Sequence, residues 1–250
     1  MRGLKDKGVL VSGGSRGIGL AAVRRFLEEG CRVFFCGLKN SEVEQTLHEL
    51  GTLGPLQGMA CDVSQPEEAV RLVESAAAWL EGIDILINNA GIAWQEPFVE
   101  ITPENWNRIL AVNLGGIFLV AQAVARHMIA RGRGGAIVNM SSTNGLVGEA
   151  LYAHYNASKG GVLTLTKTMA IELGQYGIRV NALCPGYILT PLTESLDDPA
   201  FVAAYVREKI PLGRAGKAAD VAAAYAFLAS DEAAFIHGAE LVIDGGQLSV

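Results

Sequence analysis

The sequence predicts an α/β fold in which helices cover both faces of a doubly wound, parallel, seven-stranded sheet. Short apolar runs alternate with amphipathic or alanine-rich stretches along almost the whole chain, which is the pattern of repeated strand–helix units. Several of these runs are apolar without interruption, as strands are when both of their faces are buried. Because crossovers between parallel strands are right-handed, such units build a sheet that is wound in two directions from its middle.

Seven strands and five helices account for most of the chain. We expect the strands at 9–12, 32–36, 56–61, 83–88, 136–141, 179–184 and 240–243. We expect the helices at 18–29, 67–80, 104–130, 153–173 and 218–230. Nothing resembles a linker, so one domain over residues 1–250 is predicted. Segment 187–216 departs from the alternation and contains three prolines, and we interpret it as a substrate lid over the strand ends.

Composition limits the classes of partner. Half of the 250 residues are apolar and 18% are charged, which favours a large core and, through surplus apolar surface, a homo-oligomer. The net charge of −6 without a basic cluster argues against nucleic acid as a partner. We see no signal peptide and no apolar run near the roughly 20 residues of a membrane span, so we expect a cytoplasmic protein without membrane association. The four cysteines have no metal-site spacing, and we expect no metal.

A glycine-rich turn follows the first predicted strand and opens the first predicted helix. Its glycines are spaced G-x-x-x-G-x-G from Gly13 to Gly19. Such a turn can have a purely structural role. Between a strand and a helix, however, its backbone amides can hold a pyrophosphate. The residues expected to bind a dinucleotide here are Gly13, Ser15, Arg16, Gly17, Ile18 and Gly19.

The third and fourth strands also end in residues suited to a bound nucleotide. Asp62, followed by Val63, could accept a hydrogen bond from an adenine amino group, or could simply cap a turn. Asn89, Ala90 and Gly91 follow the fourth strand, and such small residues let the backbone pass close to a ligand.

The second strand bears on the choice of dinucleotide. An acidic residue at its end would hold a ribose 2′-hydroxyl and repel a 2′-phosphate. The chain has Gly37 at that position, with Lys39 and Arg16 near enough to meet a phosphate. This favours NADP(H) over NAD(H), although Arg16 could instead be a solvated surface charge.

Tyr155 and Lys159 are predicted to lie one helical turn apart on the same face. A free phenol has a pKa of about 10, and a neighbouring ammonium lowers it toward the range useful for proton exchange. Two further polar residues accompany the pair: Ser142 ends the fifth strand, and Asn113 stands inside an apolar helical stretch. Taken alone, Asn113 would be interpreted as a satisfied core amide, and the Tyr–Lys spacing also occurs by chance.

Together these motifs resemble the short-chain dehydrogenase/reductase family, in its single-domain form of roughly 250 residues with a Rossmann-type fold. The resemblance covers essentially the whole chain, in order. It rests on Ser12-Gly13-x-x-x-Gly17-x-Gly19, Asn88-Asn89-Ala90-Gly91, Asn113, Ser142, Tyr155-x-x-x-Lys159 and Pro185-Gly186.

The resemblance implies a role for each of these residues. Tyr155 would exchange the proton with the substrate oxygen, Ser142 would polarise that oxygen, and Lys159 would bind the nicotinamide ribose and lower the Tyr155 pKa. Asn113 would hold a relay water. Pro185, Gly186 and Ile188 would line the nicotinamide, and Thr190 would bond its carboxamide or the pyrophosphate. A homotetramer is the family's usual assembly.

The expected function is NAD(P)-dependent interconversion of a carbonyl and a secondary alcohol, on a small ketone, sugar or polyol. The alternative is a 3-oxoacyl-(acyl-carrier-protein) reductase; a non-catalytic dinucleotide sensor would lack part of the catalytic set. His154 should point away from Tyr155, as a structural or pocket-rim residue. The residues that could shape the pocket or be ordinary loop are Trp94, Glu96, Asn144, Glu149 and Tyr187.

Overall fold

Seven parallel strands form the central sheet of the computed structural model, which describes residues 1–194 and 198–249. The spatial order is β3-β2-β1-β4-β5-β6-β9, every neighbouring pair being parallel. The strands are β1 (Gly8–Ser12), β2 (Arg32–Gly37), β3 (Leu56–Ala60), β4 (Ile85–Asn88), β5 (Gly135–Met140), β6 (Ile178–Pro185) and β9 (Glu240–Ile243). The order of the strands changes direction between β1 and β4, with β2 and β3 on one side of this pair and β5, β6 and β9 on the other, so a crevice opens at the carboxyl ends of β1 and β4. The predicted fold class is confirmed.

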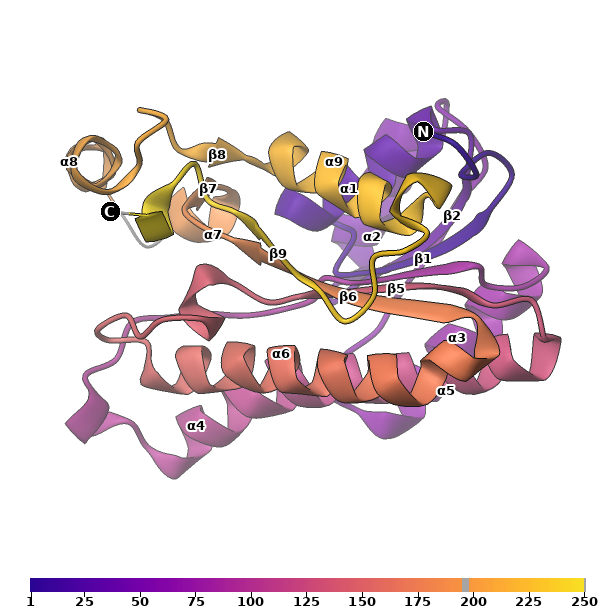
Figure 1. Cartoon of the computed structure of the whole chain (residues 1–250), viewed down its shortest axis with the longest axis horizontal. Coiled ribbons are helices and arrows are strands. Elements are labelled where there is room, and N and C mark those ends of the chain that lie inside the picture. The colour runs from indigo at the N-terminus through magenta and orange to yellow at the C-terminus, as the bar shows by residue number, and fades with distance from the viewer. Residues whose placement is uncertain (195–197, 250) are drawn as a thin grey trace.

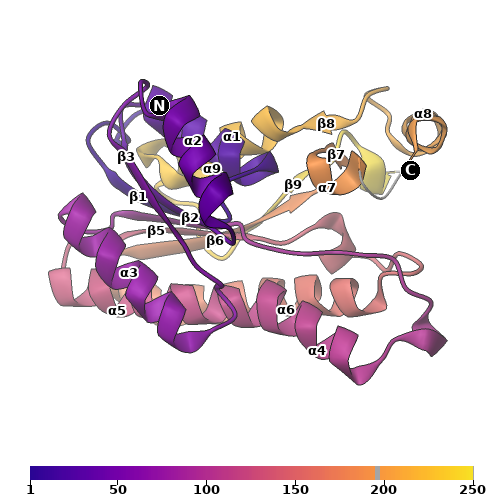
Figure 2. The same ribbon diagram turned by 180° about the vertical axis from the view of Figure 1, so that it is seen from behind.

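Helices cover both faces of this sheet (Figures 1 and 2). One face carries α1 (Gly17–Glu28), α2 (Asn40–Leu50) and α9 (Ala218–Ala229). The other carries α3 (Pro66–Leu80), α4 (Pro103–Leu110), α5 (Gly116–Arg131) and α6 (Ala153–Leu173). The short helical turns are η1 (Phe98–Glu100), η2 (Ala111–Gly115), η3 (Thr143–Gly145), η4 (Gly174–Tyr176), η5 (Asp231–Ala233) and η6 (Gln247–Ser249).

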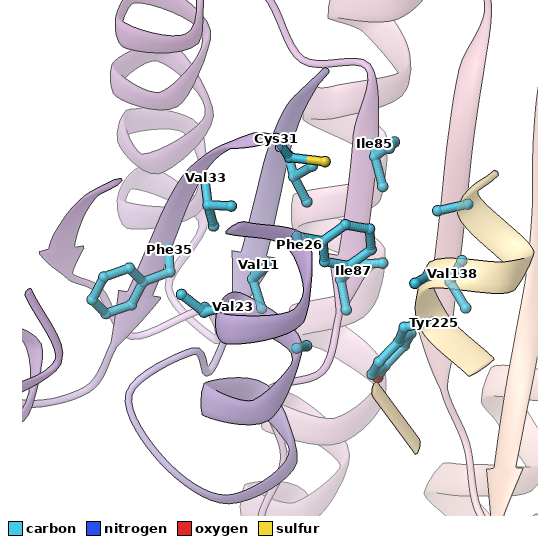
Figure 3. Close-up of a cluster of buried hydrophobic side chains, with 14 of the residues drawn as sticks. Val11, Val23, Phe26, Cys31, Val33, Phe35, Ile85, Ile87, Val138 and Tyr225 are labelled. Atoms are coloured by element: carbon cyan, nitrogen blue, oxygen red, sulfur yellow. The ribbon is translucent and has the colours of Figure 1, made fainter. Parts of the chain in front are cut away.

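The core between the sheet and the α1/α9 layer explains why these helices form. In α1 the buried residues include Ala22, Val23 and Phe26, which the helical repeat places on one face. Phe26 packs beside the strand side chains of β1, β2 and β4, and Tyr225 of α9 reaches the same cluster (Figure 3). Each large apolar side chain that is fully buried contributes about 1.5–3 kcal/mol of stability.

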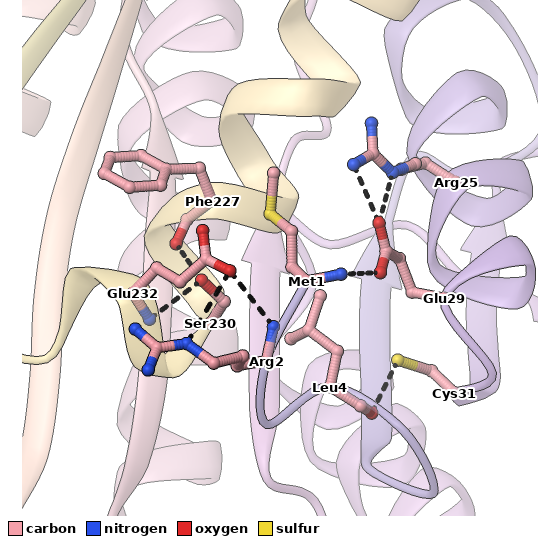
Figure 4. A network of polar contacts seen from close by, with 9 residues as sticks. All are labelled: Met1, Arg2, Leu4, Arg25, Glu29, Cys31, Phe227, Ser230 and Glu232. Atoms are coloured by element: carbon pink, nitrogen blue, oxygen red, sulfur yellow. Dashed lines mark hydrogen bonds and ion pairs between the residues drawn. The ribbon is translucent and has the colours of Figure 1, made fainter.

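The first residues of the chain hold the end of α1 to the segment after α9 (Figure 4). The Met1 amine pairs with Glu29, which also pairs with Arg25 at 2.7 Å. The Arg2 backbone N–H donates to Glu232 at 3.3 Å. The hydrogen bond from the Met1 amine, with help from Arg25, lowers the Glu29 pKa although partial burial opposes this. These contacts lie at the end of the sheet opposite the crevice, where they stabilise the fold.

Two features of the helices differ from the sequence-based expectation. Helix α2 was not predicted, although Val43 and Leu50 fall on its buried face. The helix expected at 104–130 is interrupted by η2, a π-helical turn centred on Asn113. Such turns are rare and are frequent at functional sites.

The continuous helical stretch Pro103–Arg131 is long and apolar enough to cross a membrane by length and composition. This does not overturn the expectation of no membrane span, because a buried core helix passes the same test of length and composition. Its apolar residues Val120, Val124 and Met128 pack in the core against the sheet, which is the reason for its hydropathy here.

Segment 187–216 contains ordered elements where it is described. Strand β7 (Ile188–Leu189) pairs in parallel with β8 (Gly216–Lys217), and between them lie α7 (Pro191–Glu194) and α8 (Pro199–Lys209). Asp198 caps α8 by accepting from the Ala200 and Phe201 amides. Both views place α7 and α8 beyond the carboxyl end of the sheet (Figures 1 and 2).

Candidate active site

The glycine-rich turn after β1 lets two backbone segments approach closely. Gly13 has a φ of +66°, and a Cβ added there would lie 2.9 Å from the Ala90 Cα. A Cβ on Gly19 would lie 1.9 Å from the Gly13 carbonyl oxygen. The turn therefore needs glycine at both positions, and it leaves the amino end of α1 open, as a phosphate-binding turn requires.

We expect Gly19→Ala to destabilise the protein and to abolish dinucleotide binding, because the new methyl group meets backbone that cannot move away. Alanine favours helix by about 1 kcal/mol, but overpacking costs about 1–3 kcal/mol or more. Urea unfolding and calorimetric titration with NADPH measure both effects. Gly148→Ala is the matched control, since its Cβ would meet nothing within 4 Å; equal behaviour of the two variants would contradict the prediction.

Asn89 supports this turn from the end of β4. Its side-chain amide donates to the carbonyls of Ser12 at 3.2 Å and Gly13 at 3.1 Å. In return the Ser12 hydroxyl accepts from the amides of Asn89 at 3.0 Å and Ala90 at 3.2 Å. The predicted cofactor residues of β1 and β4 are thus one hydrogen-bonded unit, in which the Asn89 side chain shapes the turn.

The end of the crevice beside β2 and β3 holds the residues predicted to meet adenosine. Asp62 accepts from the Ser64 amide at 3.0 Å and hydroxyl at 2.7 Å through one carboxylate oxygen, so it does cap a turn. Val63 is buried, Arg16 is exposed at the N-cap of α1, and Ile18 is half-buried in its first turn.

Glu42 is a residue of this region that sequence reasoning missed. It lies in the first turn of α2, where its carboxylate accepts from the Ser15 hydroxyl at 3.3 Å and pairs with Lys39 at 3.6 Å. Gly37 is buried beside them, and a Cβ there would lie 2.5 Å from the Ser15 Oγ. The i, i+3 spacing from Lys39 was the available signal, but only once α2 is recognised.

Tyr155 and Ser142 line one cleft together. Ser142 follows β5, and its hydroxyl accepts from the Asn144 amide at 3.1 Å, which fixes the turn η3. Tyr155 lies in the first turn of α6 and is half-buried. The other residues lining the cleft are Ala93, Gln95, Thr143, Asn144, Glu149, Tyr152, Gly186, Tyr187, Ile188, Leu192, Thr193, Phe201, Tyr205 and Gln247.

Lys159 stands one helical turn behind Tyr155. Its Nζ lies 5.6 Å from the centroid of the Tyr155 ring and donates to the Met140 carbonyl at 2.9 Å. The side chain is buried, and desolvation lowers its pKa from 10.5 to about 8. A Cβ on Gly91 would lie 3.6 Å from this Nζ, so the end of β4 passes directly in front of the lysine.

The expected lowering of the Tyr155 pKa is not found in the protein by itself. Burial raises this pKa to about 12, the Ser142 hydrogen bond opposes the rise, and the electrostatic effects of the neighbouring Tyr152 and Glu149 add to it. The physical reason is that burial disfavours the charged phenolate of Tyr155, and burial likewise disfavours the charged form of Lys159 and lowers its pKa. The proximity of Lys159 is therefore not enough to lower the Tyr155 pKa in the protein alone.

Asn113 is completely buried in the π-turn η2. Its side chain donates to the Ile92 carbonyl and accepts from the Ile92 amide, both at 2.8 Å, and also donates to Ser158 Oγ at 3.3 Å. It thereby joins the loop after β4 to α6, one residue from Lys159. The side chain is satisfied by these three bonds.

The predicted nicotinamide residues lie at the end of β6 and in β7. Gly186 donates its amide to Ile243 of β9 at 3.0 Å and lines the cleft next to the buried Pro185 and Ile188. Thr190 approaches the glycine-rich turn, since a Cβ on Gly17 would lie 3.7 Å from the Thr190 Cβ. The crevice therefore runs from Gly37 past the turn to Tyr155.

Of the residues that could shape the pocket, Asn144, Glu149 and Tyr187 line the cleft, whereas Trp94 and Glu96 do not. Asn144 donates to the Glu149 carboxylate at 2.7 Å. His154 is fully buried, as a structural residue would be.

Known proteins resemble this chain along almost its full length. Residues 13–247 match a family model described as enoyl-(acyl carrier protein) reductase. The L-rhamnose-1-dehydrogenase of Scheffersomyces stipitis is 39% identical, covering 97% of this chain and 96% of the relative. The 3-oxoacyl-(acyl-carrier-protein) reductase of Thermotoga maritima is 39% identical, over 97% and 98%. The crystal structure of a short-chain type dehydrogenase/reductase from Mycobacterium marinum superposes with a TM-score of 0.92 at 36% identity, over 98% and 96%.

The chain belongs to the short-chain dehydrogenase/reductase family. It is accordingly an oxidoreductase that acts on CH–OH groups and their carbonyl counterparts. The members of this family use NAD(P)(H), and the residues here fit such a group: Gly13 and Gly19 allow the tight turn at the amino end of α1, and Gly91 brings the backbone after β4 close to Lys159.

Proposed function

We propose that the protein interconverts a small ketone and its secondary alcohol, with a sugar or polyol as the favoured substrate and NADP(H) as the favoured cofactor. The observation that carries this proposal is the joint placement of Ser142 and Tyr155 in the cleft wall with Lys159 behind them. When bound, the nicotinamide supplies or accepts the hydride. The protein supplies orientation and the proton.

Each catalytic residue has a part that its contacts support. Tyr155 donates a proton to the substrate oxygen in reduction and accepts it in oxidation. Ser142 hydrogen-bonds that oxygen and the phenol. Lys159 binds the nicotinamide ribose, and its charge and that of an oxidised nicotinamide both favour the phenolate. Asn113 would hold the relay water; its side chain is engaged by Ile92 and Ser158.

The cleft wall supports a compact hydroxylated substrate. The aromatic rings of Tyr152, Tyr187 and Tyr205 line it, together with the polar pair Asn144–Glu149. Apolar rings pack against the carbon face of a sugar while amide and carboxylate groups meet its hydroxyls. A relative of similar length is named for L-rhamnose, which supports the same class. Segment 187–216, through α7 and α8, would act as the substrate lid.

A 3-oxoacyl-(acyl-carrier-protein) reductase is the second candidate. The Thermotoga maritima relative carries this name. The last turn of α8 has exposed Arg207 and Lys209, of which Arg207 pairs with Glu208 at 3.0 Å, so Lys209 is the cation of this turn left to meet an acidic carrier. A substrate panel of ketoses, polyols, simple ketones and 3-oxoacyl thioesters, run in both directions with NADH and NADPH, separates the two. Turnover confined to thioesters would establish the alternative.

The preference for NADP(H) is supported by Gly37, which leaves no carboxylate at the end of β2, and by the cations Arg16 and Lys39 nearby. We expect Gly37→Asp to shift the ratio of kcat/KM values toward NADH by about tenfold or more, because a carboxylate repels the 2′-phosphate and can hold a 2′-hydroxyl. Calorimetric dissociation constants for both cofactors check the same shift.

Gly37→Asn is the matched control for this change. It brings the same contact with the Ser15 Oγ without the charge, so it separates crowding from electrostatics. If Gly37→Asn and Gly37→Asp alter the preference equally, or if the wild type already prefers NADH, the NADP(H) proposal is wrong.

We further propose a cytoplasmic homotetramer that engages neither a membrane nor nucleic acid. Large apolar side chains are exposed on the outer faces of α5 and α6, among them Phe118 and Ile171, the latter 82% exposed. Such surface is costly unless another subunit covers it. Light scattering coupled to gel filtration should give four times the 26.4 kDa of one chain; a monomer would contradict the assembly.

A further inference from the structure

A half-buried polar cluster around the fully buried His154 lies outside the residues that line the cleft. The Glu96 carboxylate accepts from the Trp94 indole at 3.1 Å and from the Asn105 amide at 3.1 Å. The His154 Nε2 lies 3.5 Å from the same carboxylate. The His154 ring is fully buried and packs edge-on against Trp94, with 5.2 Å between ring centroids.

His154 also serves the backbone at the beginning of α6. The N-cap residue of this helix, Tyr152, makes no side-chain capping bond, so the first amides of the helix need other acceptors. The Tyr155 amide finds one in the His154 Nδ1, at 2.8 Å. Since Nδ1 is the acceptor, a neutral His154 carries its proton on Nε2, which faces Glu96.

Glu96 is fixed in turn by the chain around it. Its amide donates to the Leu151 carbonyl at 2.8 Å, which joins the loop after β4 to the residues just before α6. The indole and amide donors lower the Glu96 pKa, so a carboxylate faces the imidazole. Burial lowers the His154 pKa, and Glu96 is the charged group among the described residues that opposes this.

We propose that Glu96 and His154 are positioning residues that hold the first turn of α6, and with it the Tyr155 phenol, in the orientation for proton exchange. This inference rests on the proposed function of Tyr155. The pair acts through two contacts: a 3.5 Å polar approach of the carboxylate to the imidazole Nε2, which makes no hydrogen bond, and the hydrogen bond that the Tyr155 amide donates to Nδ1. It touches neither substrate nor cofactor, because neither side chain lines the cleft.

The test uses His154→Phe, which keeps a ring against Trp94 but removes the acceptor. We expect kcat to fall by about 10- to 100-fold, with the calorimetric Kd for NADPH unchanged and the kcat–pH profile displaced. His154→Asn keeps an acceptor at the same number of bonds from the backbone, so it should recover most of the lost kcat. Glu96→Gln should show an intermediate loss and the same displacement of the pH profile.

His127→Phe is the matched control. The His127 Nε2 accepts the Ile83 amide at 3.3 Å, far from the cleft, so its loss should lower the stability without changing kcat or the pH profile. If His154→Phe lowers only the melting temperature, as His127→Phe does, the positioning role is overturned. If Tyr155→Phe itself retains full turnover, the proposed function fails first, and the two failures are thereby told apart.

Discussion

Replacement of Tyr155 by phenylalanine is expected to lower kcat by about 10²- to 10⁴-fold in both directions. The ring is retained, so its edge-on contact with Tyr152, 6.0 Å between centroids, remains and the cleft keeps its shape. Only the hydroxyl that Ser142 bonds is lost. Steady-state turnover and the calorimetric Kd for NADPH measure the two quantities, and the Kd should change little.

Tyr225→Phe is the control for removing a tyrosine hydroxyl. Tyr225 is fully buried in α9 against the sheet, and its hydroxyl has no hydrogen-bond partner among residues 1–194 and 198–249. Its loss should leave kcat unchanged. A Tyr155→Phe enzyme with wild-type turnover would refute the assignment of the proton exchanger.

Lys159→Met is expected to remove activity and yet to stabilise the protein. The loss of the ammonium behind the phenol should lower kcat by about 10²-fold or more. The buried lysine has a pKa of about 8 in the folded chain against 10.5 as its reference, which corresponds to about 3 kcal/mol of destabilisation. Methionine removes this penalty, and the lost bond to the Met140 carbonyl offsets about 1–2 kcal/mol of the gain.

The pH dependence of this gain has a definite sign. Between pH 8 and 10.5 the unfolded chain binds the lysine proton more strongly than the folded chain does, so the wild type gains stability as the pH rises. The destabilisation caused by the buried, charged Lys159 is complete below pH 8 and absent above pH 10.5. The stability advantage of Lys159→Met in urea unfolding should therefore be largest at pH 7 and shrink at pH 10; an advantage that grows with pH would contradict the interpretation.

The fold was predictable because its strands are short, apolar and regularly separated, and strands buried on both faces leave that signature. Helix α2 was not, since its polar residues outnumber its apolar ones and only its tertiary contacts bury Val43 and Leu50. The π-turn at Asn113 was not predictable either. Its residues are of types that also occur in ordinary helices. What distinguishes it is the pair of hydrogen bonds between the Asn113 side chain and the Ile92 backbone.

The residues of the candidate site likewise fall into those that the sequence predicted and those that it did not. Gly13, Ser142, Tyr155 and Lys159 could be named because motif spacing reflects backbone geometry, and the structure places them along one crevice. The Tyr155 pKa could not be derived, because it depends on the burial of two groups at once. Glu42 and Glu96 contact residues that other helices and loops bring close to them in space. The sequence pattern did not define those helices and loops.

The separation between α6 and segment 187–216 has a consequence for how such enzymes diversify. The groups proposed to exchange the proton lie on a long helix packed against the sheet, whereas α7, α8 and their neighbours supply much of the rest of the cleft lining. Mutations in the latter can alter the molecules accepted without disturbing the chemistry of the former. Relatives named for a sugar and for an acyl thioester are the outcome to be expected of such a modular plan, and redesign for a new ketone should begin at Phe201 and Tyr205.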